Sequence, residues 1–333
     1  MKLDPIFSDG VVFSEDRPVR VFGAGDSPVT VRLRGEEKIV IPQNGRWLAE
    51  LPAMSAGGPY TLTVLCGDEN IVINDVYVGI VYLLAGQSNA EFTLGESSEP
   101  ESGYESDPLL RNHFIKRPWI DPDVFGADDG WRSARADDVA RWSAIAYLAG
   151  RETRRLTGKA VGIVSCFQGA SVIESWLPKD VADGFRLAYS DLMIDHYYPD
   201  YSAWNGNGLI YEKMLSPLAP FSLCGVIWYQ GESDTSVPEG RIYDAELCRF
   251  MRTVRSDFMD PGLRFAVIQI ADYDQRREYD PEGWKIIQRA QELAVAADGH
   301  SKLVVSSDVC ESTCIHPTHK TELSVRAAKA LLD

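Results

Sequence analysis

The chain has 333 residues, with 49 acidic against 33 basic side chains and a formal net charge of −16. This balance argues against a nucleic-acid-binding protein, because such proteins need a basic surface to meet the phosphate charge. The length predicts one or two domains, each able to bury its own core.

Residues 1–77 differ in pattern from the rest of the chain. Short alternating segments, such as 19–22, 29–33 and 60–64, are separated by Gly, Pro, Asn and Asp, and none has a sustained helical period. Alternation of this kind is typical of strands with one buried face. We therefore expect a small antiparallel β-sandwich domain over residues 1–77.

Location and redox state are predicted from the same composition. The first seven residues lack the long apolar stretch of a signal peptide, and no apolar run reaches 18 residues. We therefore expect a cytoplasmic protein with no membrane partner. The six cysteines are scattered along the chain, which favours free thiols over a disulfide framework.

Residues 78–85 form an apolar, β-branched run that predicts a buried strand. The run ends at Gly86, and Gln87 and Ser88 follow. A serine on a tight turn after a strand can serve as a nucleophile at the carboxyl edge of an α/β sheet. Serines in turns more often form a local turn or cap a helix, and residues 87–88 alone allow either interpretation.

Two irregular segments follow that can contribute to a binding site. Residues 93–138 are acidic and contain Pro and Gly, and we expect them to form a partly ordered wall of the site. Residues 195–204 are rich in Tyr and Trp. These rings can stack on a sugar or can pack against the core.

Strands and helices alternate through the rest of the chain. Further apolar runs at 160–166, 223–229, 264–270 and 302–307 are separated by helical patterns at 143–155, 243–255 and 283–295, and a last helix is expected at 321–331. Uniformly apolar strands between helices predict a parallel sheet covered on both faces. We therefore expect residues 78–333 to form a three-layer α/β/α sandwich with a five-stranded parallel sheet. The carboxyl ends of its strands would bring together Ser88, Gly169, Gln230 and His316.

Four sequence blocks make the chain similar to a known family. They are Gln-Ser-Asn at 87–89, Ile-Glu-Ser-Trp at 173–176, Trp-Tyr-Gln-Gly-Glu-Ser at 228–233 and Ile-His-Pro at 315–317. Together they resemble the signature blocks of the sialate O-acetylesterase branch of the SGNH hydrolases, which also contains acetylxylan esterases. Segments at 5–13, 45–47 and 58–64 resemble the β-domain that precedes the hydrolase domain in that branch. The resemblance implies a flavodoxin-like fold, a serine nucleophile, no cofactor, and removal of acetyl groups from the hydroxyls of sialic acid or xylan-type sugars.

Ester hydrolysis needs a nucleophile, a base and donors for the oxyanion. Ser88 is the expected nucleophile, and its own N–H, the N–H of Gly169 and the carboxamide of Gln230 are the expected oxyanion donors. The role of Gln230 is implied by the family branch. Gln87, Asn89 and Glu232 are expected to support the site, and Glu232 to bond backbone or an arginine and so order its loop.

His316 is the expected base. It is one of five histidines, and it lies between the last strand and the terminal helix, beside Pro317. An imidazole pKa near 6.5 suits a base at neutral pH. Taken alone, a His-Pro pair before a helix indicates a surface turn more often than a base.

The third member of the triad is the point where the chain departs from the family. Many SGNH enzymes carry an Asp two or three residues before the histidine, where this chain has Cys314 and Thr313. We expect either a Ser–His dyad, with a backbone carbonyl accepting the Nδ1 proton, or a carboxylate from Asp308 or Glu311.

Two alternatives belong to other classes of protein. Cys310, Cys314, His316 and His319 can be interpreted as a zinc cluster, although their spacing is not a usual structural-zinc pattern. The second alternative is a carbohydrate-binding module without turnover. The identity of the sugar stays open, since Arg111, Arg117 or Arg132 could bind a sialate carboxylate.

Overall fold

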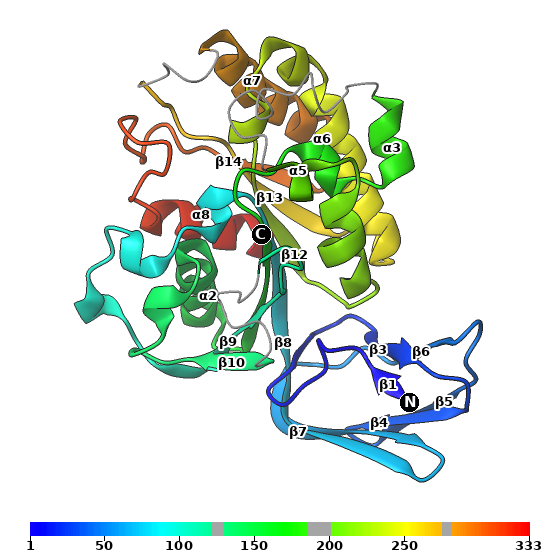
Figure 1. The fold of residues 1–333 in the computed structure, drawn as a ribbon. Coiled ribbons are helices and arrows are strands. Elements are labelled where there is room, and N and C mark those ends of the chain that lie inside the picture. Colours follow the sequence, from blue (N-terminus) through cyan, green and yellow to red (C-terminus); the bar gives the residue numbers. More distant parts are fainter. Residues whose placement is uncertain (121–129, 186–200, 275–280) are drawn as a thin grey trace.

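The computed structural model describes residues 1–120, 130–185, 201–274 and 281–333. Figure 1 shows a small unit of strands at the N-terminal end, drawn in blue, below a larger unit in which helices flank a sheet. In the described parts of the chain, no helix has both the length and the apolar character that a membrane crossing requires.

The N-terminal strands form two small sheets. Strands β1 (Lys2–Leu3), β3 (Val19–Ala24) and β6 (Arg46–Leu51) pair with one another, while β4 (Val29–Leu33) pairs with β5 (Glu36–Val40) and β7 (Gly57–Cys66). The alternating pattern expected from the sequence appears in β6, whose residues are exposed and buried in turn. All of these pairings are antiparallel.

A single long strand joins the two units. β8 (Glu69–Gly86) pairs antiparallel with β7 over its first half and parallel with β11 and β12 over its second half. The short strand β2 (Val12–Ser14) runs parallel to the middle of β8. The expected boundary between residues 77 and 78 therefore falls inside a continuous strand.

The large sheet contains all five expected strands and two more. Its order is β10-β9-β11-β8-β12-β13-β14, formed by β9 (Asp107–Phe114), β10 (Trp131–Ala134), β11 (Val161–Phe167), β12 (Gly225–Tyr229), β13 (Arg264–Ile268) and β14 (Ser301–Val304) with β8. β9 is parallel to β11, and β10 is antiparallel to β9 at the edge. The expected count of five parallel strands was therefore too low, because β9 also belongs to the parallel set.

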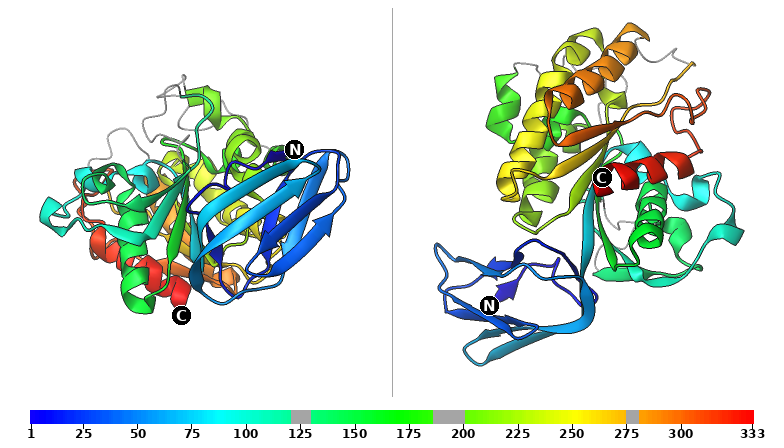
Figure 2. Two further views of the ribbon diagram at one scale, coloured as in Figure 1. Left: turned by 90° about the horizontal axis from the view of Figure 1, so that it is seen from below. Right: turned by 180° about the vertical axis from the view of Figure 1, so that it is seen from behind.

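Helices cover both faces of this sheet, as Figure 2 shows from two further directions. The helices are α1 (Ser88–Glu91), α2 (Ala144–Thr157), α3 (Lys179–Gly184), α5 (Ser202–Asn205), α6 (Val237–Asp257), α7 (Pro281–Ala297) and α8 (Thr321–Leu332). Along β8, Ile80, Tyr82 and Leu84 pack with residues of α2 and α8, whereas the alternate positions pack with residues of α6 and α7. The two-residue period of the strand thus divides its side chains between two apolar layers.

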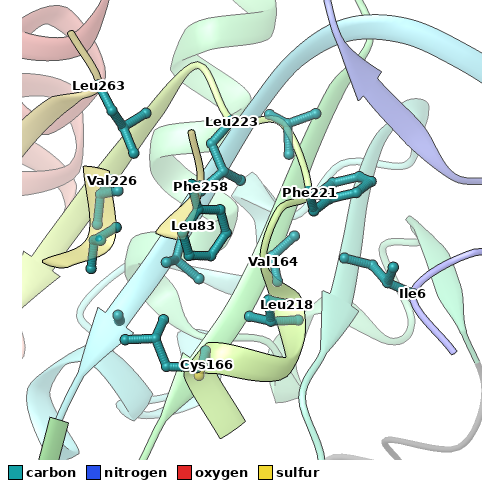
Figure 3. Close-up of a cluster of buried hydrophobic side chains, with 14 of the residues drawn as sticks. Ile6, Leu83, Val164, Cys166, Leu218, Phe221, Leu223, Val226, Phe258 and Leu263 are labelled. Atoms are coloured by element: carbon teal, nitrogen blue, oxygen red, sulfur yellow. The ribbon is translucent and has the colours of Figure 1, made fainter. Parts of the chain in front are cut away.

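One of these layers continues into the N-terminal unit. Figure 3 shows Leu83 and Val164 of the sheet in a cluster that also contains Phe221 and Ile6. The rings of Phe7 and Phe221 lie 5.9 Å apart, which joins the two units through aromatic contact. All six cysteines are free thiols, as expected.

Candidate active site

Three strand ends meet at the expected nucleophile. Phe167 at the end of β11 and Tyr229 at the end of β12 are both in register with Gly86 at the end of β8. Gly86 has a φ of +146°, and a Cβ there would lie 2.0 Å from the carbonyl oxygen of Tyr229. Only glycine allows this approach, which brings Ser88 to the first position of α1 at the carboxyl edge of the sheet.

Ser88 and His316 are in direct contact. The Nε2 atom of His316 lies 2.8 Å from the Oγ atom of Ser88, although the two residues are 228 positions apart in the sequence. Both residues are half-buried. Burial, and after it the charge of Lys320, lower the pKa of His316. The imidazole is therefore neutral at pH 7 and can accept the proton of the serine hydroxyl.

The structure does not place Asp308 beside His316. Both Asp308 carboxylate oxygens accept from Arg326, at 2.7 and 2.8 Å, on the surface of the molecule. Glu311 is also turned away, since it accepts from the backbone N–H of Thr318 and contacts the His319 ring at 2.7 Å.

Asp308 was therefore a wrong candidate for the third member of the triad. Neither Glu311 nor the expected backbone carbonyl takes that place. Among the described residues, none accepts a hydrogen bond from the Nδ1 of His316.

The oxyanion donors differ in their availability. The N–H of Ser88 begins α1, and no acceptor for it lies within the described parts of the chain. Gly169 lines the same cavity as Ser88, and its N–H donates to Oε2 of Glu91 at 3.1 Å. Oε1 of Glu91 is held in turn by Arg117 at 2.8 Å. A carboxylate thus accepts the hydrogen bond that Gly169 would give to an oxyanion.

Gln230 does not supply a donor to this place, contrary to expectation. Its side chain is fully buried, and its Nε2 donates to the carbonyl of Ser171 at 2.8 Å and to the carboxylate of Asp234. Its Oε1 accepts from the hydroxyl of Tyr243 at 2.7 Å. Gln230 therefore ties the loops after β11 and β12 together.

The three expected support residues all lie at the site. Oε1 of Gln87 accepts from the N–H groups of Gly231 and Ser233, both at 3.3 Å, and so fixes the loop after β12. Nδ2 of Asn89 donates to Oε1 of Glu232 at 2.5 Å. Glu232 is buried, and its carboxylate accepts from this carboxamide and from its own backbone N–H, so the expected backbone partner is present beside a side-chain partner that was not expected.

A cavity of about 450 Å³ opens over the Ser88–His316 pair. Arg117 and Ile120, from the acidic segment 93–138, form part of its wall. Tyr201 and Trp204 line it as well, with ring centroids 4.9 Å apart. Residues 195–200 of the expected aromatic segment lie outside the described residues.

The residues proposed as a zinc cluster do not converge. His316 is turned toward Ser88, and His319 contacts Glu311. Across the described ranges, no three His, Cys, Asp or Glu side chains are arranged to hold a metal ion.

Two residues at the site were missed by the sequence reasoning. Lys320 is buried, with Nζ 2.6 Å from Oδ1 of Asn89. Glu91 reaches Gly169 and Arg117. Lysines and glutamates near helix ends are ordinarily solvated, so no local signal distinguished these two.

Comparisons with known proteins identify the family to which the chain is similar. The sequence model of a family described as "Carbohydrate esterase, sialic acid-specific acetylesterase" matches residues 78–333. The human sialate O-acetylesterase is 26% identical over 346 aligned residues, and the alignment covers 92% of this chain and 65% of the human protein. The rat sialate O-acetylesterase is 24% identical, with 92% of this chain and 67% of the rat protein covered.

A solved structure is similar over nearly the whole chain. A carbohydrate acetylesterase from Xanthomonas citri has a TM-score of 0.85 and 28% sequence identity, covering 98% of this chain and 74% of its own. The alignments with the human and rat proteins show that the present chain spans about two thirds of the length of these curated relatives.

Proposed function

This chain belongs to the sialic acid-specific acetylesterase family of carbohydrate esterases, and we propose that it hydrolyses acetyl esters on sugar hydroxyls through an acyl intermediate on Ser88. The observation that carries this proposal is the 2.8 Å contact between the Ser88 hydroxyl and the neutral imidazole of His316. The cavity above the pair, with its Tyr201 and Trp204 rings, has the shape and the aromatic lining that a sugar needs.

The chemistry follows the usual course of acyl transfer. His316 takes the proton of Ser88 as the oxygen attacks the acetyl carbonyl, and the resulting oxyanion receives the N–H of Ser88. His316 then gives its proton to the departing sugar oxygen. Water, activated by the same imidazole, releases acetate and restores the serine.

Gly169 supplies the second oxyanion hydrogen bond in this proposal. Its N–H is directed to the site but is occupied by Glu91 in the unliganded protein. The carbonyl oxygen of the substrate would therefore displace Oε2 of Glu91, while Arg117 keeps the displaced carboxylate paired. We do not assign a catalytic role to Gln230 or Asp308, because their side chains are committed elsewhere.

The identity of the sugar depends on the charges around the cavity. Arg111 is remote from it, since its guanidinium binds Asp75 and the carbonyl of Gly10. Arg117 lines the cavity and is paired with Glu91. A sialate carboxylate would have to compete with Glu91 for Arg117, whereas a neutral sugar would not.

The architecture of the chain completes the proposal. We propose that residues 1–77 form a β-sandwich domain and residues 78–333 the catalytic domain, with β8 common to both. The cytoplasmic location expected from the sequence stays a prediction, which cell fractionation would test.

A panel of acetylated sugars tests the proposed activity. Acetylated sialic acid, acetylated xylo-oligosaccharides and acetylated hexoses are offered to the wild-type protein and to Ser88→Ala, and released acetate is measured. We expect the wild-type protein to release acetate from at least one class and Ser88→Ala to release none above background. Sugar binding by both proteins without any release would favour the binding-module alternative.

A further inference from the structure

Lys320 is a buried cation that contacts Asn89, the residue after Ser88. Its side chain is 1% exposed, and its Nζ lies 5.1 Å from the ring centroid of Phe92 and 5.0 Å from that of Tyr229. Removing an ammonium group from water is costly unless polar partners replace the water. The partner that the structure provides is Oδ1 of Asn89, at 2.6 Å.

The Asn89 carboxamide connects this cation to both members of the pair. Asn89 directly follows the nucleophile, and its Nδ2 donates to the carbonyl of Ile315, the residue before the base, at 2.9 Å. The same Nδ2 donates to Oε1 of Glu232. Because Lys320 donates to Oδ1, the amide must present its N–H groups to Ile315 and Glu232. The Asn89 carboxamide therefore links the backbone segment that carries Ser88 to the segment that carries His316.

We propose that Lys320 is a positioning residue for the Ser88–His316 pair, which fixes the Asn89 carboxamide and holds a positive charge beside the imidazole. This inference rests on the proposed function, in that the pair acts as nucleophile and base. A misplacement of about 1 Å in such a pair costs roughly 10²-fold in rate. A fixed amide between the two backbones prevents that displacement.

The surroundings of Lys320 determine whether its side chain carries a charge. Burial lowers the pKa of Lys320 to about 8, and the opposing influences come from Glu232, Glu311, Cys310 and Cys314. The group is therefore mostly charged at pH 7.

The charge of Lys320 also acts on the base. Burial and Lys320 lower the pKa of His316, and Glu96 acts in the opposite direction. Removing the charge of Lys320 is expected to raise the pKa of His316 and to leave more of the imidazole protonated at neutral pH.

The test uses Lys320→Met in the full chain, which keeps the apolar stem and removes the charge. The titration of the His316 imidazole is followed by NMR, and the pH profile of kcat/KM is measured on an acetyl ester. We expect His316 to titrate at higher pH, the acidic limb of the profile to move upward by the same amount, and kcat to fall by about 10²-fold with little change in KM. Lys329→Met, at an exposed lysine in the last turn of α8, the helix that Lys320 precedes, is the matched control and should change none of these.

A second variant separates positioning from charge balance. Lys320→Met removes the positive charge that lowers the pKa of the buried Glu232 carboxyl group, so the melting temperature should fall. Lys320→Met/Glu232→Gln removes that unpaired charge. We expect the double variant to regain the melting temperature of the wild-type protein. The pKa of His316 should stay above its wild-type value, and kcat should stay below its wild-type value.

Two results would overturn the proposal. One is an unchanged titration of His316 in Lys320→Met, and the other is recovery of both kcat and the titration in the double variant. The NMR titration does not depend on turnover. A wild-type protein without esterase activity would therefore refute the proposed function, and the titration would still decide the coupling of Lys320 to His316.

Discussion

His316 has one side-chain hydrogen bond to the described residues, and its partner is the Ser88 hydroxyl 2.8 Å away. In a Ser-His-Asp triad a carboxylate orients the imidazole and stabilises the imidazolium that forms during the reaction. Here two other contacts orient His316 instead. The Phe92 ring packs with its centroid 6.1 Å from that of the imidazole, and the side chain of Asn89 donates a hydrogen bond to the backbone carbonyl of Ile315, the residue before His316. The arrangement of the Ser88–His316 pair therefore depends on packing and on neighbouring backbone more than on a direct anionic partner.

Asp308→Asn tests this description of the base. Because the carboxylate binds Arg326 on the surface, we expect kcat/KM to stay within about 3-fold of wild type, as is usual for a surface change away from the site. His316→Ala, assayed beside it, shows the full loss for comparison. A loss approaching 10⁴-fold in Asp308→Asn would mean that Asp308 acts as the triad acid.

Gly169→Ala keeps the backbone N–H and tests whether the acyl group lies against Gly169. The added Cβ would lie 3.3 Å from Oε2 of Glu91 and 3.7 Å from Cβ of Ser88, where the acyl group must fit. We expect kcat/KM to fall by about 10²-fold, because the methyl group displaces the acyl group from its position beside Ser88, with the melting temperature nearly unchanged. Gly184→Ala, where a Cβ meets nothing within 4 Å, is the matched control. Full activity in Gly169→Ala would show that the acyl group does not pass Gly169.

At the scale of elements, the short helix at Ile173–Trp176 packs against α6 through buried carboxylates. Both carboxyl oxygens of Glu174 are buried with no hydrogen-bond partner among the other residues that the structure describes, and burial raises the pKa of Glu174 to about 8 from 4.5. Burial also raises the pKa of Asp234 and Glu246, each further raised by the charge of Glu174. These acids are thus protonated in the folded protein under conditions that ionise them in the unfolded chain.

The sign of the pH dependence follows from these raised pKa values. The stability contributed by a protonated Glu174 is complete below pH 4.5 and is lost as the pH rises toward about 8. We expect the free energy of unfolding, measured with urea, to fall by more than about 1 kcal/mol from pH 5 to pH 8. Glu174→Gln should flatten this slope. A stability that rises over this interval in the wild-type protein would contradict the account.

The elements that the sequence predicted well are those with a strong local pattern. The strands β11 and β12 are buried along their whole length, and each was expected within two residues of its observed bounds. The expected run at 78–85 is only the second half of β8, which begins nine residues earlier, at Glu69. β9 was missed because it contains Pro108, Arg111 and Asn112, so its apolar residues do not form a run. Arg111 is buried because β9 lies against the N-terminal unit. The residue pattern of segment 107–114 gives no sign of this long-range contact.

The site was predictable in its centre and not in its surroundings. Ser88 follows β8 and His316 follows β14, and the parallel topology places the carboxyl ends of both strands at the same edge of the sheet. The partners of Gln230, Asp308 and Lys320 depend on which side chains face one another across loops. Those partners are set by tertiary packing and could not be found from residue type or spacing.

At the scale of the whole molecule, the two units share a strand and a core. β8 runs through both, and the Arg111 guanidinium binds the carboxylate of Asp75 at 2.8 Å and the carbonyl of Gly10 at 2.8 Å. Phe221 is buried against rings of the N-terminal unit. We therefore expect the two units to unfold together.

Phe221→Ala tests that cooperativity. The lost ring should cost about 3–5 kcal/mol of stability, and amide exchange should increase together in β4 of the N-terminal unit and β11 of the large sheet. Val72→Ala, at a position 45% exposed on β8, is the control and should have little effect. Faster exchange confined to one of the two strands would show that the units unfold independently.

The central claim, that Ser88 and His316 act as one catalytic unit on acetyl esters, is tested most directly by a double-mutant cycle. The measurement is kcat/KM for acetate release from the best acetylated sugar, for the wild-type protein, Ser88→Ala, His316→Ala and the double variant. We predict that each single variant loses several orders of magnitude and that the double variant is no worse than either, because residues of one unit are not additive. Two independent and multiplying losses, or substantial activity left in Ser88→Ala, would contradict the account.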